Sequence, residues 1–426
     1  MKRKHFKLGT AVAIAAAGAL VLSACAGDST GGDAGDGPVT LTLSQWWQPE
    51  AGGMLEEVVA AFEEENPDIT IELQTGPYGT TKDQYVTGAA SGSLPDILGL
   101  DPNWVYDLTK QGVLADLDAL DEEAGSGLVD SIEGVVVDDA TRALNVAYAT
   151  YVLFVNTEVL GQAGAEVPAT WEQFRATAEA IKAAAPDVSP TVLPLSLESP
   201  VGIKNDLLSW FWAEEGTFRD GAGADLVTPE LEEVMTYFAD LNAAGLIAPG
   251  IANMKEQDKV EAFSNGQTAM MVSATPHINL VRDSGQVDFT VAPIPTPEGF
   301  DGTPGATYGS WAVGVAESSP NKAAAWKFVE FVLSAAQNAD LAGAANLYPA
   351  NPDSELDVTS MDENGAAAYE IWKSGTPVDE FLGLPSADEL QRTLIEQTQR
   401  ILTGDVDAAA GLEAAQEEWD GIIGAG

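Results

Sequence analysis

The sequence predicts an α/β fold in which helices cover both faces of a parallel sheet. Segments 39–44 and 69–73 alternate apolar with polar residues, and this period of two is typical of half-buried strands. A third, short buried strand is expected at 94–100. Helical patterns separate these strands, and such alternation is typical of parallel sheets. With 426 residues the chain exceeds one typical domain, which favours two or more lobes.

The first helix is expected between the first two strands. Its apolar residues recur at helical spacing from Met54 to Phe62, with glutamates on the opposite face. Asn66 and Pro67 end it, because proline cannot continue a helix. A further helix is expected over 103–110, directly after the third strand.

The rest of the chain continues to alternate strands with helices. Strands are expected at 147–155, 268–273, 287–293 and 310–316. Helices are expected at 206–215, 229–243, 255–265, 323–333, 388–402 and 408–423. Another helix opens at Thr170, because Thr170 and Gln173 have the spacing of a capping box.

The charge of the chain excludes several classes of partner. There are 19 Lys and Arg against 66 Asp and Glu, which gives a formal net charge of −47. Nucleic acids are bound by clustered Lys and Arg that neutralise phosphates, so a nucleic-acid binder is excluded. Anionic lipid surfaces are disfavoured for the same reason.

The sequence offers little for metal or catalytic chemistry. It contains two histidines, His5 and His277, and one cysteine, Cys25, so we expect no metal, no cofactor and no disulfide. The usual nucleotide, hydrolase and metalloprotease motifs are missing, and we expect a protein that is not an enzyme. A glycan hydrolase stays open as an alternative, because it needs only two carboxylates facing each other across a cleft.

The amino terminus has the features of an export signal. Four basic residues precede an apolar run that ends in Leu22-Ser23-Ala24-Cys25, which resembles a bacterial lipobox. We therefore expect residues 1–24 to be a signal peptide and Cys25 to be lipidated. Residues 25–37 are rich in Gly, Asp and Ser and are expected to form a flexible tether. A soluble secreted protein with an incidental cysteine is the alternative.

The ends of three predicted strands carry aromatic and polar residues, and ligands bind beyond such strand ends in open α/β sheets. These residues are Trp46, Trp47, Asp101, Asn103, Trp104, Tyr148 and Tyr151. Sugars have flat C–H faces and a rim of hydroxyls, which aromatic rings and Asp or Asn side chains match. Core packing of the tryptophans is the alternative. Two adjacent tryptophans of a strand face opposite sides, so at least one of Trp46 and Trp47 is expected to face a cleft.

Four further tryptophans lie at packing positions of predicted helices, and we assign them to structure. They are Trp171, Trp326, Trp372 and Trp419.

Several short stretches, in this order along the chain, resemble one known family. They are FE-x-x-NP at 62–67, SGSLPDI at 91–97, QGVL-x-x-LD at 111–118, Asn156 followed by VP-x-TWE-x-F at 167–174, FSNGQTAM at 263–270 and SPNK-x-x-AW-x-F at 319–328. With them, residues 39–423 resemble an extracellular solute-binding protein of bacterial ABC importers, in the sugar-binding group that includes maltose-binding protein.

The resemblance implies two α/β lobes joined by crossing strands, with a sugar held between the lobes. Residues 38–148 and 310–362 would form the first lobe, and residues 149–309 and 363–426 the second. The crossings would fall near Tyr148, near Tyr308–Ser310 and after about Ser360.

The resemblance also suggests binding residues. Gln48, Asp101, Asn103 and Trp104 match the sugar contacts of the first lobe, and Tyr148 and Tyr151 the first crossing. Residues 204–206, including Asn205, and Trp210 match the second lobe's contact region. Tyr308, Ser310 and Trp311 match the segment that re-enters the first lobe. Relatives often have tryptophan shortly after the Ala-Met strand, where this chain has His277 instead, so His277 or Trp210 would substitute for that platform.

The function implied is capture of a carbohydrate and its delivery to an ABC transporter permease, by a monomer anchored through lipid to the outer face of the cell membrane. A peptide or cationic solute is an alternative ligand, because the chain is strongly acidic. A surface-anchored glycan hydrolase and a purely adhesive lipoprotein are alternatives from other classes.

Overall fold

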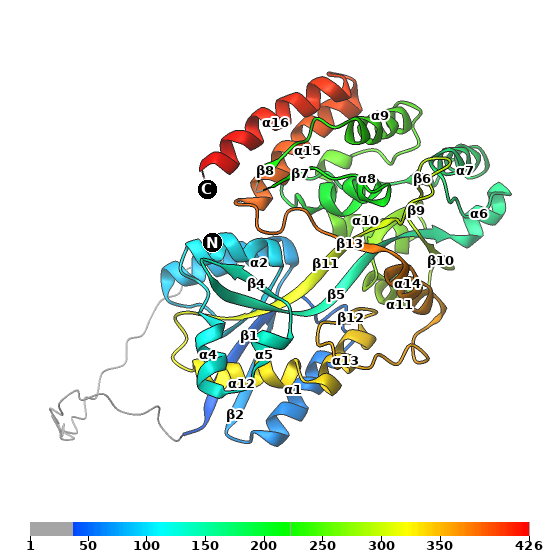
Figure 1. Cartoon of the computed structure of the whole chain (residues 1–426). Helices are drawn as coiled ribbons and strands as arrows, with labels where there is room; N and C mark the ends of the chain where they lie inside the picture. Colours follow the sequence, from blue (N-terminus) through cyan, green and yellow to red (C-terminus); the bar gives the residue numbers. More distant parts are fainter. Residues whose placement is uncertain (1–36, 222, 426) are drawn as a thin grey trace, which may run out of the picture. The chain divides into compact units, whose positions relative to one another are not determined.

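The computed structural model describes residues 37–221 and 223–425. The predicted signal peptide, the lipidated Cys25 and nearly all of the predicted tether lie outside the described residues. The α/β class predicted from the sequence is confirmed in the described part of the chain (Figure 1).

One mixed sheet organises the described residues. Its main path runs β2 (Ile69–Thr75), β1 (Val39–Gln45), β3 (Ile97–Leu100), β11 (Gly305–Val315), β5 (Ala140–Asn156), β9 (Thr268–Ala274) and β6 (Ser189–Thr191). Four short strands pair beside this path: β4 (Gly134–Val137), β10 (Phe289–Ala292), β12 (Tyr348–Pro349) and β13 (Thr376–Val378). A separate pair is formed by β7 (Arg219–Asp220) and β8 (Gly223–Ala224).

The expectation of a parallel sheet needs a correction. Strand β1 pairs in parallel with β2 and β3, and β6 with β9, as the strand–helix alternation predicted. However, β11 is antiparallel to both β3 and β5, and β5 is antiparallel to β9. The reason is that β11 and β5 pass through the middle of the sheet in opposite directions, a long-range arrangement that local periodicity does not encode.

Strand β5 connects the two parts of the sheet. Its first half pairs with β4, β11 and β12, whereas residues 151–156 pair with β9 and β10. Both β5 and β11 run through the centre of Figure 1, between the helices drawn at its top and those at its bottom. The crossings expected near Tyr148 and Tyr308–Ser310 fall within these two strands. The lobe boundaries themselves stay a prediction.

The helices gather around the two parts of the sheet. Those near β1, β2 and β3 are α1 (Met54–Glu65), α2 (Tyr78–Ser91), α3 (Val105–Lys110), α4 (Leu117–Ala124), α5 (Leu128–Ser131), α12 (Lys322–Val332) and α13 (Ala335–Ala344). Those near β9 and β6 are α6 (Thr157–Ala163), α7 (Trp171–Ala184), α8 (Leu208–Ala213), α9 (Pro229–Ala243), α10 (Glu256–Ser264), α11 (His277–Ser284), α14 (Glu363–Ser374), α15 (Ala387–Thr403) and α16 (Ala408–Ala425). Short 3-10 turns span Pro102–Trp104 and Ile251–Asn253.

Two predicted helices differ in detail from the structure. The helix expected at 103–110 is a 3-10 turn followed by α3, because the Asp101 side chain accepts a hydrogen bond from the Asn103 amide and tightens the first turn. The helix expected at 206–215 is a π-helical turn over Ile203–Leu207 followed by α8. The cap at Thr170 is confirmed, although the Gln173 amide oxygen accepts from the Ala169 amide and not from that of Thr170.

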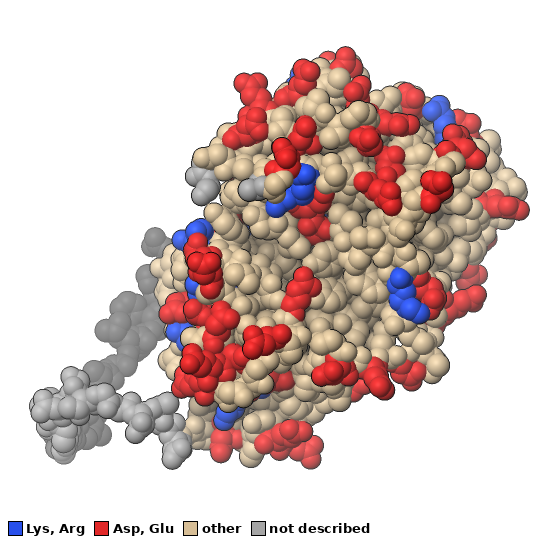
Figure 2. Space-filling view, in the orientation of Figure 1, with Lys and Arg blue, Asp and Glu red and all other residues tan. Residues whose placement is uncertain are grey.

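Acidic side chains dominate the face shown in Figure 2, where Lys and Arg are sparse. Within the described residues, no helix has the length and apolar content required to span a bilayer. The same residues contain no group of three or more His, Cys, Asp or Glu side chains placed to hold a metal ion.

Candidate functional site

The candidate site is a cavity of about 70 Å³ beside the central strands. One side is formed by residues that follow β1 and β3, together with Tyr78 at the start of α2. The opposite side is formed by Lys204, Asn205 and the first residues of α10 and α11. Strands β5 and β11 form its floor through residues 149, 151 and 309–311. Segments far apart in the sequence therefore meet at the two strands that join the parts of the sheet.

Aromatic rings form much of the cavity wall. Trp46, Tyr78, Tyr151 and Trp311 line it. The Trp46 ring lies 5.2 Å from the Tyr78 ring, with the two planes 78° apart. Such rings offer flat apolar faces to a ligand and are fixed by the packing behind them.

Two buried tryptophans support the rings that face the cavity. Trp47 is 2% exposed and stacks on Trp311 at 5.1 Å with an interplanar angle of 8°. Trp104 is 3% exposed and packs against Trp46 at 5.1 Å. The adjacent residues Trp46 and Trp47 follow the end of β1, and packing gives them different positions: Trp46 lines the cavity, whereas Trp47 is buried behind it.

A buried network of charges lies beside this aromatic wall. The Tyr78 hydroxyl donates to Asp101 at 2.8 Å, and Lys204 Nζ lies 2.7 Å from the Asp379 carboxylate. The Asn103 amide also donates to Asp379, at 3.0 Å. Burial raises the pKa of Asp101, and the positive charge of Lys204 opposes this shift. Lys204 is itself buried, but Asp379 and Asp101 more than offset that burial and raise its pKa.

A second buried charge group lies behind the opposite wall. Lys259 Nζ is 2.9 Å from both Asp206 carboxylate oxygens and 2.7 Å from the Val272 carbonyl oxygen. The Glu256 Oε1 atom is 3.8 Å from the same ammonium. Burial raises the pKa of Asp206 to about 7, which Lys259 opposes.

Two polar atoms in the cavity wall have no hydrogen-bond partner among the described residues. They are Glu256 Oε1 and Asn205 Oδ1, and the two residues are 8% and 1% exposed. An unpaired buried acceptor costs free energy. Both atoms are therefore suited to accept hydrogen bonds from a bound ligand.

The structure brings together half of the site residues expected from the sequence. Those that line the cavity are Trp46, Asp101, Tyr151, Asn205, His277, Ser310 and Trp311. His277 Nε2 lies 3.7 Å from Glu50 Oε1, and its Nδ1 is 2.8 Å from the Ser273 hydroxyl.

The other expected residues lie outside the cavity wall. Trp47, Asn103 and Trp104 lie behind the residues that face it. Gln48 hydrogen-bonds to Gln45, Thr75 and Glu56 at the end of β1.

Tyr148, Tyr308 and Trp210 also lie elsewhere. Tyr148 and Tyr308 pack with Trp372 away from the cavity, at ring distances of 6.1 and 6.5 Å. Trp210 is 2% exposed and packs among aromatic rings of α7 and α9, so it provides no platform.

Four polar or aromatic lining residues were not singled out from the sequence: Glu50, Tyr78, Glu256 and Gln257. Tyr78 follows Gly76-Pro77 just after β2, so the strand-end criterion that selected Trp46 could have found it. Glu256 opens α10, and no local signal marks it, since an acidic residue in the first turn of a helix is ordinary.

An apolar cavity of about 350 Å³ adjoins the site. It shares Trp46, Glu50, Tyr78, Gln257 and His277 with the first cavity. Trp46 and Tyr78 therefore contribute to the walls of both cavities.

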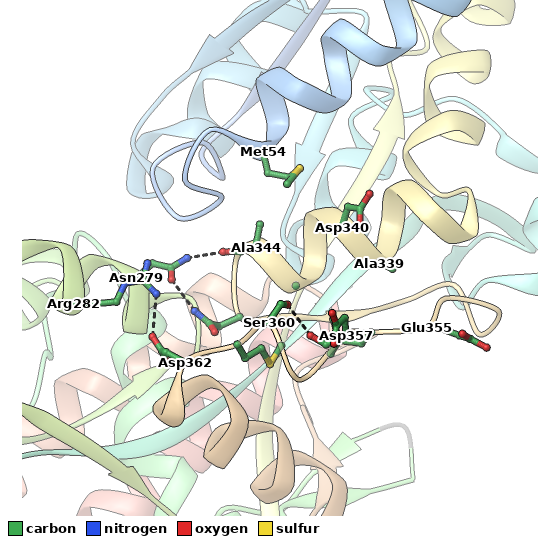
Figure 3. Close-up of a pocket in the computed structure, with 14 residues that line it drawn as sticks. Met54, Asn279, Arg282, Ala339, Asp340, Ala344, Glu355, Asp357, Ser360 and Asp362 are labelled. Atoms are coloured by element: carbon green, nitrogen blue, oxygen red, sulfur yellow. Dashed lines mark hydrogen bonds and ion pairs between the residues drawn. The ribbon is translucent and has the colours of Figure 1, made fainter.

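A further cavity of about 320 Å³ lies between α11, α13 and the loop at 355–362 (Figure 3). Its wall contains no aromatic ring, and Asn279, Asn346, Arg282 and Asp362 are bonded to one another or to neighbouring backbone. This space lacks the stacking surface of the candidate site.

The fold and this site define the class of protein. Residues 57–368 match the sequence model of the bacterial extracellular solute-binding proteins, and the chain belongs to this family. A protein of Brucella abortus strain 2308 whose name calls it a binding protein is 26% identical over 395 residues, which cover 91% of this chain and 93% of that protein.

Solved structures show the same two-lobed fold. A solute-binding protein of an ABC transporter from Thermotoga lettingae, bound with α-D-tagatose, has a TM-score of 0.76 at 20% identity and covers 90% of this chain and 99% of that one. Maltose-bound MalE3 of T. maritima has a TM-score of 0.74 at 23% identity and covers 90% of this chain and 100% of that one.

Proposed function

We propose that this protein captures a carbohydrate in the candidate site and delivers it to the permease of an ABC importer, without chemical turnover. The observation that carries the proposal is the cavity lining, which combines four aromatic rings with two residues that each have a buried acceptor without a partner among the described residues. Rings stack on the C–H faces of a sugar, and the acceptors take hydrogen bonds from its hydroxyls. The sugars bound by the two structural neighbours named above agree with this ligand class.

The size of the cavity bears on how the ligand enters. Its volume of about 70 Å³ is well below the ~300 Å³ at the lower end of small-molecule sites. A sugar can occupy it only if the walls move apart and close again. The two proposed lobes, residues 38–148 with 310–362 and residues 149–309 with 363–426, would rotate about β5 and β11. The ligand would favour the closed state because it touches both walls.

The location follows from the family and from the amino-terminal sequence. The family is extracellular. Lipid attachment at Cys25 would hold a monomer at the outer face of the membrane, beside the permease. Mass spectrometry of the mature protein tests this, since a diacylglyceryl group on an amino-terminal Cys25 is expected and an unmodified residue would contradict it.

Calorimetry against a panel of mono- and oligosaccharides tests the function. We expect at least one sugar to bind with about micromolar affinity, near −8 kcal/mol. Trp46 and Trp311 line the cavity, so the same sugar should change the tryptophan fluorescence. The proposal fails if no sugar gives either signal while peptides or polyamines do.

A hydrolase is the competing class, and the same samples distinguish it. Sugar recovered after incubation should be intact by chromatography. Cleaved product that disappears when one Asp or Glu of the cavity is replaced would contradict capture without turnover.

A further inference from the structure

The charge of the candidate site is unbalanced. Among the residues that line it, Glu50, Asp101 and Glu256 are acidic, and Lys204 is the one lysine or arginine. Lys204 does not balance these three, because its ammonium lies 2.7 Å from a fourth carboxylate, that of Asp379. The wall and its immediate support therefore carry an excess of negative charge.

Glu256 is a buried acid of the cavity wall that lacks a full partner among the described residues. The nearby Lys259 ammonium binds both Asp206 oxygens at 2.9 Å and the Val272 carbonyl at 2.7 Å, which uses its three hydrogens. Glu256 Oε1 is 3.8 Å away, beyond hydrogen-bond distance, and has no other partner among the described residues. The Lys259 ammonium thus lies near two buried carboxylates, those of Asp206 and Glu256, but hydrogen-bonds to Asp206 alone of the two.

The neighbouring groups indicate the same excess of negative charge. Asn205 adds a second buried acceptor without a partner. Burial raises the pKa of the Tyr151 phenol well above its usual value, and the carboxylates of Glu256, Asp206, Asp101 and Glu50 raise it further. The cavity around this ring therefore favours a positive charge.

A neutral hydroxyl would satisfy only part of this requirement. It can donate a hydrogen bond to Glu256 Oε1, but the buried negative charge would remain uncompensated. An ammonium group donates the hydrogen bond and also balances the charge. The aromatic rings of the same cavity require a ligand with apolar faces.

We propose that the ligand is an amino sugar, whose protonated amine binds the Glu256 carboxylate while its ring stacks on the aromatic wall. This assignment rests on the proposed capture of a carbohydrate and narrows its chemical class.

Three sugars that differ in one substituent test the assignment. They are the β-1,4-linked disaccharide of glucosamine, its N,N′-diacetyl form and cellobiose, with the three corresponding monosaccharides. These carry an amine, an acetamide or a hydroxyl at the same position. Calorimetry is done at a pH below the pKa of the sugar amines. We expect the amine form to bind about tenfold more tightly than its acetylated and hydroxyl forms, as a desolvated ion pair of 1.5 kcal/mol or more would give.

Two variants separate a local contact from the overall charge. Glu256→Gln keeps the shape and an amide oxygen as acceptor but removes one negative charge from the cavity, so it should lower the affinity for the amine form about tenfold and that for neutral sugars by a smaller factor, about threefold. Glu64→Gln makes the same change on the exposed side of α1 and should leave both affinities unchanged. A loss of similar size in both variants would mean that the net charge of −47, and not Glu256, attracts the amine.

The outcomes distinguish this inference from the proposed function. If a neutral sugar of the wider panel binds at least as tightly as the amine forms, the amino-sugar assignment is overturned and the capture of carbohydrate stands. If no sugar of either kind binds, both are overturned. The comparison of the three substituents needs only the unaltered protein, so it holds even if Glu256→Gln folds poorly.

Discussion

Trp46 contributes to the shape of the candidate site through several contacts. It lies in the wall of the small cavity and of the adjoining apolar cavity, and it touches Trp47, Tyr78 and Trp104. An aromatic contact is worth about 0.5–1.5 kcal/mol beyond the area that it buries. That contribution alone changes an affinity by about 2-fold to 13-fold, and the loss of the buried stacking area adds to it.

Replacing Trp46 by Ala should weaken sugar binding by about 10-fold to 100-fold, because both the stacking surface and the support of Tyr78 are lost. Titration calorimetry measures the change. Trp46→Phe should retain part of the affinity. Trp372→Ala provides the control, since Trp372 is a half-buried tryptophan outside the cavity wall. Equal losses at positions 46 and 372 would argue against the assigned site.

Glu214 shows how a single buried acid can reduce stability. Burial, with the charges of Glu233 and Glu230, raises the pKa of this carboxyl to about 8. Its Oε1 atom has no partner among the described residues, and the residue follows the carboxyl end of α8, where negative charge is unfavourable. The folded state therefore retains a proton that the unfolded chain releases near pH 4.5.

The free energy of unfolding should decrease as the pH rises from about 4.5 to about 8, since the unfolded state binds fewer protons in this window. Glu214→Gln carries no charge at any pH. Its free energy of unfolding should equal that of the original protein near pH 4.5 and exceed it by about 1 kcal/mol near pH 8. This difference is already reduced for screening by solvent. Urea denaturation at both pH values measures this. A stability difference that does not change with pH would contradict the role of this carboxyl.

At the scale of elements, Lys82 joins three helices that come from distant parts of the chain. Its ammonium in α2 lies 2.8 Å from Asp107 in α3 and 2.7 Å from Asp388 in α15. The Ser386 amide, just before α15, also donates to Asp107. In the proposed division of lobes these contacts connect the first lobe to the second, at the side of the cavity.

Lys82→Met should weaken ligand binding about threefold to tenfold, because Asp107 and Asp388 then repel each other and the closed state becomes less populated. A partly exposed pair contributes about 1 kcal/mol, which sets this range. Lys110→Met is the matched control, since Lys110 pairs with Asp138 at an exposed position. The two affinities are compared by calorimetry at low and high salt. An affinity unchanged by Lys82→Met would show that these contacts do not couple to binding.

At the scale of the whole molecule, the two central strands and the large acidic charge have the widest consequences. Strands β5 and β11 are the elements through which the two parts of the sheet are joined. The net charge of −47 keeps the protein away from anionic surfaces and attracts cationic solutes at low ionic strength.

The proposed hinge predicts that a bound sugar makes the molecule more compact. Small-angle scattering should show a smaller radius of gyration at saturating sugar and no change with a sugar that does not bind. The same sugar should stabilise the fold by about 2.7 kcal/mol at a concentration of 100 times its dissociation constant. A sugar that stabilises the fold without reducing the radius of gyration would contradict the hinge. A purely adhesive protein would show neither the stabilisation nor the smaller radius of gyration.

The sequence alone determined many of the elements and several of the residues that line the cavity, although helices α2, α4 and α13 were not expected. Periodicity identified β1, β2 and β9, and the class of fold followed from their alternation with helices. Trp46, Asp101 and Tyr151, which were selected as strand-end residues, all line the cavity, although Tyr151 lies within β5 and not at its end. Their role in binding stays a prediction. These features are local, because a strand exposes alternate residues and ends at a fixed position whatever packs against it.

The tertiary structure decided which of these side chains reach the cavity. Trp46 and Trp47 are neighbours, and only packing against Trp311 turns the second one inward. Tyr148 and Tyr151 lie three positions apart in β5 and therefore face opposite sides of the strand. Packing decides which side bears the cavity, and Tyr148 lies on the other side, against Trp372.

The charges of the site also depend on contacts between distant segments. Lys204 pairs with Asp379 across 175 positions, and Lys259 pairs with Asp206 across 53, so that Glu256 is left without a full partner. Hydrophobic periodicity reports which face of an element is buried, but it does not report what lies opposite that face. The aromatic character of the site could therefore be predicted from the sequence. Its negative charge could not, because that charge depends on which carboxylates pair with Lys204 and Lys259 in the folded protein.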